Sequence, residues 1–178
     1  MQTDRDPVET ATKRLSTYAP MVVLNFDQPA FPVSYVASAI GASLDTVRSW
    51  IKRDGIKSFG EKEEEVFLRR VGSYYYLSPR KALHIAATFA LVGFGMPSRK
   101  ASLAAAHWTE AGTTDRLPAD VFKKSGATFL VAYHPNSEPP AEVVHQSNLA
   151  VACSKAPAVV VNLNTLTAEL FNKLGMTP

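Results

Sequence analysis

Apolar residues recur at helical spacing in two adjacent stretches of the chain. Those of the first stretch are Val33, Val36, Ala37 and Ile40, and those of the second are Leu44, Val47, Trp50 and Ile51. Each series gives a helix one apolar face and one polar face. Gly41 suits the left-handed conformation that ends a helix, and Ser43 can cap the next one. The pattern predicts two short helices that pack together across a tight turn, which is the layout of a helix–turn–helix.

The residues that follow alternate between β-prone and turn-forming types. Residues 56–65 are charged and predict a loop, whereas Val66–Arg70 and Tyr74–Leu77 predict the two strands of a hairpin around Val71-Gly72-Ser73. Because side chains alternate across a strand, one or two of the three tyrosines at 74–76 should face the core. The hairpin would form a wing beside the two helices.

Two further helices are expected after the hairpin. Ser78-Pro79 is a cap followed by a proline at the first helical position, and the helix should run to about Phe94, before Gly95. Ser98 is expected to cap the next helix, which carries one stripe of small and aromatic residues at Ala101, Ala104, Ala105 and Trp108. Together these elements predict a winged helix–turn–helix over residues 31–108.

The rest of the chain has a different pattern. We expect residues 1–30 to be an N-terminal arm with a short strand at Met21–Phe26, and residues 109–126 to be a linker. Residues 127–178 should form a small α+β domain whose elements are a strand at 127–134, a possible strand within 138–146, a helix at 147–155, a strand at 156–163 and a final helix capped by Asn164 or Thr165. The predicted fold is therefore mainly α with small β elements.

Charge is concentrated in the predicted winged domain. The 178-residue chain is 46% hydrophobic and carries a net charge of +3, whereas residues 31–108 hold eleven cations against six anions, an excess of five positive charges. A locally basic domain favours a polyanionic partner. There is no run of 18 apolar residues and no signal peptide after Met1, so we expect a cytoplasmic, nucleoid-associated protein without a membrane partner.

Three motifs resemble the DNA-binding domain of MerR-type regulators. Ala37, Gly41 and Val47 have the offsets of a bacterial helix–turn–helix, GIKSFG at 55–60 is similar to that family's exit into the wing, and GSYYYLSPRKAL at 72–83 is similar to its "Gly-Tyr-Arg-x-Tyr" segment. The resemblance implies a dimer that grips a palindromic site in double-stranded DNA. The related excisionase-type proteins use the same module in phage recombination. Unlike that family, this chain breaks its helix at Thr109–Pro118 and has a single cysteine, Cys153.

The candidate DNA contacts lie on the polar face of the second helix and on the wing. Arginine can bind both acceptors of guanine, and Ser, Thr, Tyr and Lys can reach phosphates. The candidates on the helix are Ser43, Thr46, Arg48, Ser49, Lys52 and Arg53, those on the wing are Arg69, Arg70 and Tyr74, and those at the start of the third helix are Arg80 and Lys81.

The sequence thus predicts a sequence-specific transcriptional regulator that binds DNA as a homodimer. Either the C-terminal unit or the apolar third helix would form the dimer interface. The alternatives are an excisionase-like architectural protein that bends DNA and a protein-binding adaptor whose basic surface meets an acidic partner. The four histidines and the cysteine have no metal-ligand spacing, so neither a metal, a cofactor nor an enzymatic activity is expected.

Overall fold

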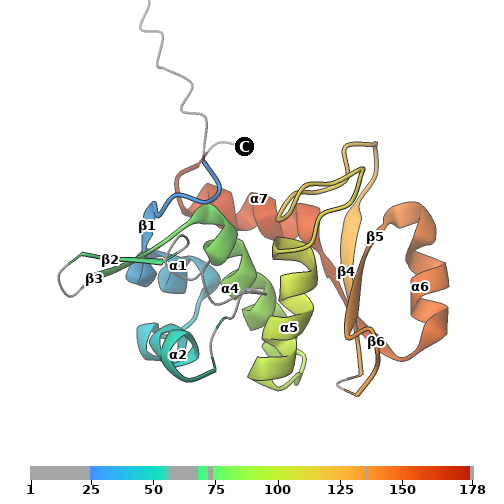
Figure 1. Cartoon of the computed structure of the whole chain (residues 1–178), viewed down its shortest axis with the longest axis horizontal. Helices are drawn as coiled ribbons and strands as arrows, with labels where there is room; N and C mark the ends of the chain where they lie inside the picture. Colours follow the sequence, from blue (N-terminus) through green and yellow to red (C-terminus); the bar gives the residue numbers. More distant parts are fainter. Residues whose placement is uncertain (1–24, 55, 57–67, 72–73, 135, 177–178) are drawn as a thin grey trace, which may run out of the picture.

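The computed structural model describes residues 25–54, 56, 68–71, 74–134 and 136–176 (Figure 1). Its elements are β1 (Phe31–Pro32), α1 (Val33–Ile40), α2 (Leu44–Ser49) with a π-helical continuation η1 (Trp50–Asp54), β2 (Leu68–Val71), β3 (Tyr74–Leu77), α4 (Pro79–Gly93), α5 (Ser98–Thr109), β4 (Thr128–Tyr133), β5 (Ala141–His145), a 3₁₀ turn η2 (Gln146–Asn148), α6 (Leu149–Lys155), β6 (Ala158–Asn162) and α7 (Leu163–Lys173). The described chain is mainly helical with two three-stranded sheets, which confirms the predicted fold class.

The turn between α1 and α2 forms as its residue types predict. Gly41 has a φ of 74°, in the left-handed region, and its N–H and that of Ala42 bond carbonyls at the end of α1. The Ser43 hydroxyl accepts a hydrogen bond from the Thr46 N–H at 3.0 Å, which caps α2. Val47 is fully buried where the two helices meet.

The first sheet has the order β1-β3-β2, and every pair in it is antiparallel. The β2–β3 hairpin agrees with the predicted wing over the described residues 68–71 and 74–77. Strand β1 was not expected, because it has two residues and one of them is Pro32; it pairs through Phe31 opposite Leu77. The strand predicted at Met21–Phe26 lies mostly outside the described residues, and Asn25 and Phe26 are not in a strand.

Two predicted helix caps are wrong. Helix α5 begins at Ser98 itself, the cap position is Pro97, and no side chain bonds there. Helix α7 begins at Leu163, and the cap is Asn162, whose Oδ1 accepts from the Thr165 N–H at 3.2 Å. The Asn164 side chain instead accepts a hydrogen bond from the backbone of β4 at Thr128, at 2.6 Å. This long-range partner displaces the local cap that the sequence indicates.

The second sheet has the order β5-β4-β6 and is covered on both faces. Along β4, Leu130 and Ala132 join the main core, which also contains residues of α4, α5 and α7, whereas Val131 and Tyr133 pack in a smaller cluster with Ala152 of α6. Figure 1 shows this layering, with α6 on the outer side of the sheet and the other helices on the inner side. A central strand covered on both faces explains why TFLVAY is apolar throughout.

One hydrophobic core joins the predicted winged domain to the C-terminal unit. Helix α7 returns across the sheet to pack on α4 and α1, and it contributes Leu163, Leu170 and Phe171 to the same buried cluster as Leu83 and Trp108. Helix α4 is enclosed by α5, α7 and β3, which explains its apolar character and leaves it unavailable as a dimer interface.

The predicted linker packs closely on the end of α5. Arg116 is 2% exposed, and its guanidinium donates to the carbonyl oxygens of Trp108 and Leu117 at 2.9 Å and to that of Ala111. The Trp108 indole N–H donates to the Asp120 carbonyl at 3.0 Å. A buried cation at the carbonyl end of α5 thus closes the helix and fixes the segment that leads to β4.

Candidate nucleic-acid interface

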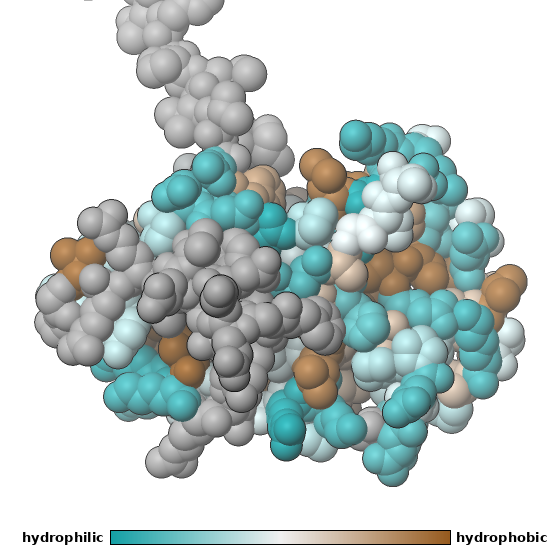
Figure 2. Space-filling view, in the orientation of Figure 1, coloured by the Kyte–Doolittle hydropathy of each residue, from teal (hydrophilic) through white to brown (hydrophobic). Residues whose placement is uncertain are grey.

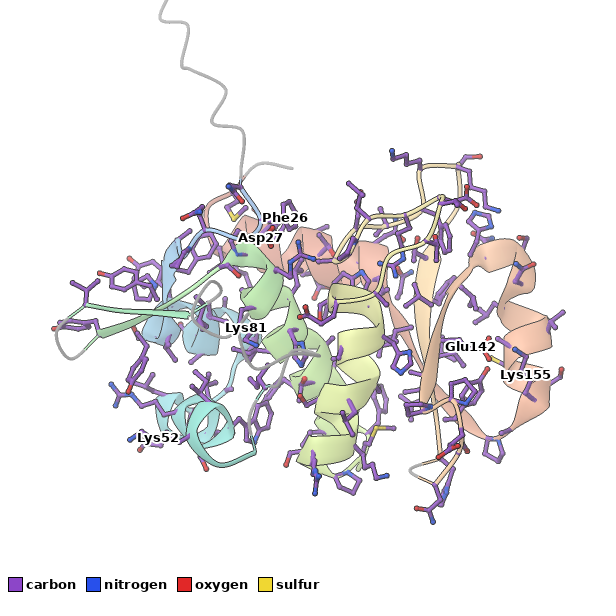
Figure 3. All side chains as sticks on the ribbon, in the orientation of Figure 1. Phe26, Asp27, Lys52, Lys81, Glu142 and Lys155 are labelled. Carbon is purple, nitrogen blue, oxygen red and sulfur yellow. The ribbon has the colours of Figure 1, made fainter. Side chains whose placement is uncertain are left out.

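Helix α2 buries one face and leaves a basic face in solvent. Val47 and Trp50 are buried, and the Trp50 ring lies 6.3 Å from that of Phe89 on α4. On the opposite side Arg48 and Lys52 are exposed. Figure 3 shows Lys52 on the outer side of α2, away from α4, and Figure 2 shows hydrophilic surface there. The arrangement holds the helix rigidly while its cations remain accessible.

The two cations have no charged partner inside the protein. No ion pair joins Arg48 or Lys52 to any residue in the described part of the chain. The predicted contact residues Ser43, Thr46 and Ser49 lie on the same helix; Ser43 is exposed, but its hydroxyl already caps the helix and contacts the Thr46 hydroxyl at 2.8 Å. The Arg53 side chain lies outside the described residues.

The wing presents one tyrosine to solvent and turns another to the core. Tyr74 is exposed, Tyr75 packs against the core and Tyr76 is half-buried, which confirms the predicted alternation. Arg69 and Arg70 lie in β2 opposite Tyr76 and Tyr75, and their side chains are outside the described residues. Val71, which the sequence pattern placed in the turn, is the last residue of β2 and is also exposed.

Arg80 and Lys81 do not belong to this surface. Arg80 Nε donates to the Asp27 carboxylate at 2.6 Å and its Nη1 donates to the Thr109 carbonyl at 3.0 Å. Lys81 is buried, and its ammonium donates to the carbonyl of Ile56 (Figure 3). We therefore correct their predicted role: both cations tie the start of α4 to neighbouring segments and are not available to phosphates. Their partners are distant in sequence, so no local pattern indicated this.

A buried polar network supports the helices behind the interface. His84 on α4 is fully buried, with Nδ1 2.9 Å from the Thr109 hydroxyl and Nε2 3.0 Å from the Ser102 hydroxyl, both on α5. Desolvation lowers the pKa of His84, which favours the neutral ring. Glu110 lies 3.9 Å away. The serine–histidine–carboxylate order resembles a hydrolase triad, but serine and histidine are enclosed, and we assign the network a structural role.

Helix α2 and the wing occupy the same end of the molecule, and the second sheet with α6 occupies the other (Figure 1). Among the described residues, no three His, Cys, Asp or Glu side chains are placed to hold a metal ion. Within the same residues, no helix combines the length and apolarity needed to span a bilayer. No protein-family model matches the chain, and no curated protein matches it.

Proposed function

We propose that this protein binds double-stranded DNA through α2 and the wing and acts as a sequence-specific transcriptional regulator. The observation that supports it best is the pair Arg48 and Lys52, exposed and without an ion-pair partner in the described chain, on a helix whose other face is fixed by Val47 and Trp50. In a helix–turn–helix the second helix enters the major groove. The net positive charge of residues 31–108 supports the same function.

Each exposed group has a matching contact on DNA. The forked guanidinium of Arg48 can donate to O6 and N7 of one guanine, whereas the ammonium of Lys52 is a point charge suited to a phosphate. The wing would follow the adjacent backbone. We further propose that a homodimer reads a palindromic site, because one six-residue α2 covers too few base pairs to specify a genomic site alone.

The test is a salt titration of binding to labelled random duplex DNA. We compare the wild type with Arg48→Ala/Lys52→Ala and with the matched control Arg99→Ala/Lys100→Ala, which removes the same charge from exposed positions on α5. The α2 variant should bind more weakly, and its slope of log affinity against log salt should be shallower by about one to two. Equal losses in both variants, or no duplex binding by the wild type, would refute the proposal; the second result would favour a protein-binding adaptor.

A further inference from the structure

Two large apolar side chains are exposed side by side at the end of the wing. Val71 is 49% exposed and Tyr74 is 67% exposed, and the two residues lie directly opposite each other in the β2–β3 ladder. Directly opposed residues of an antiparallel pair point to the same face of the hairpin, with Cβ atoms about 4.5–5.5 Å apart. They therefore form one apolar surface, which we call the wing-tip pair.

Packing within the protein does not account for this surface. Tyr75, the next residue along β3, packs against the core, and Tyr76 is half-buried, whereas neither Val71 nor Tyr74 is among the side chains that contact the core. Figure 1 shows the hairpin extending away from the helices, and Figure 2 shows a hydrophobic area at that edge of the molecule. An apolar pair at the end of an extended hairpin is placed to enter a narrow space in a partner.

We infer that the wing-tip pair is an apolar wedge that enters the minor groove and kinks the DNA at one base step. The inference rests on the proposed function. Apolar side chains that insert between base pairs kink a duplex by about 20–90°. The partner is DNA rather than an apolar protein surface because Arg69 and Arg70 directly precede Val71 in β2, so two cations accompany the wedge and suit the flanking phosphates.

The position of the wing agrees with this assignment. With α2 in the major groove, the hairpin at the same end of the molecule reaches the neighbouring groove (Figure 1). A pyrimidine–purine step such as TA unstacks most easily and is the step that the wedge should prefer. Bending is thus a property of the wing, and base reading is a property of α2.

The experiment measures DNA bending by energy transfer between dyes on the two ends of a duplex of about 30 base pairs, with and without a central TA step. We compare the wild type with Val71→Thr and Tyr74→Thr, since threonine keeps β-strand propensity and removes apolar surface. The matched control is Val151→Thr on α6, a valine with 64% exposure at the opposite end of the molecule. Circular dichroism verifies that each variant is folded.

The wild type and Val151→Thr should bend the TA duplex by at least about 20°, and each wing-tip variant should lose at least half of the change in transfer efficiency while still binding. Wing-tip variants that bend DNA as the wild type does would overturn the wedge. A wild type that binds DNA without bending it would also overturn the wedge and would leave the proposed function standing. A wild type that does not bind duplex DNA would overturn both.

Discussion

Replacing Phe171 with alanine should destabilise the whole protein, although this residue lies on the last helix. Phe171 is buried in the main core, and its ring meets that of Phe26 edge-on with a centroid distance of 6.0 Å. Loss of a buried phenylalanine side chain costs about 3–5 kcal/mol. With a urea m-value of about 2 kcal/mol/M, the unfolding midpoint should fall by about 1.5–2.5 M.

Tryptophan fluorescence makes this assay specific for the shared core. Both tryptophans of the chain, Trp50 and Trp108, lie in the predicted winged domain, whereas the substitution is in the C-terminal unit. The fluorescence and circular dichroism midpoints should therefore fall together. Phe94→Ala is the control, since Phe94 is exposed in the turn after α4 and should change stability by less than about 0.5 kcal/mol.

An unchanged fluorescence midpoint in Phe171→Ala, with only the dichroism signal shifted, would show that the two regions unfold independently and would refute the shared core. If the alanine variant does not fold, Phe171→Leu keeps most of the volume and should lose less than about 1.5 kcal/mol, so that its two midpoints can still be compared.

Three further substitutions or conditions test other parts of the structure. Gly126→Ala should cost about 1–3 kcal/mol in urea unfolding, because Gly126 has a φ of 124° and a Cβ there would lie 2.5 Å from the His145 ring, whereas Gly93→Ala meets no neighbour and should be neutral or stabilising. Burial lowers the pKa of His84 in the folded state, so stability should be complete above about pH 6.5 and fall by at most about 1.4 kcal/mol per unit below it; His84→Gln should remove that slope, and an unchanged slope would contradict the assignment. Arg116→Met leaves buried carbonyls without donors and should lower stability by at least about 2 kcal/mol, and a variant as stable as the wild type would show that the cation is dispensable.

Local sequence signals were sufficient for most of the secondary structure. Gly41, Ser43 and the Ser78-Pro79 pair each act within one turn of the helix that they bound, so their effects are visible in the sequence. Ser98 and Asn164 show where this reasoning ends. A serine or an asparagine near a helix start is a cap only if no distant group competes, and Asn164 bonds the backbone of β4 instead.

The features that the sequence did not reveal depend on contacts between distant segments. Arg80 and Lys81 resemble surface cations, and their partners Asp27 and Ile56 become neighbours only in the folded chain. The return of α7 onto α4 has the same character. Its apolar face indicates that something covers it, but the hydrophobic pattern does not identify what does.

The most direct test of the central claim is selection of bound duplexes from a randomised DNA library, with wild type and Arg48→Ala compared at the same salt concentration. The wild type should enrich a palindromic motif containing a guanine in each half-site. Arg48→Ala should lose preference at that guanine, at a cost of about 1–3 kcal/mol, and retain the remaining positions. Enrichment of the same motif by both proteins would remove Arg48 from base reading, and a library that the wild type leaves without any enriched motif would contradict sequence-specific binding.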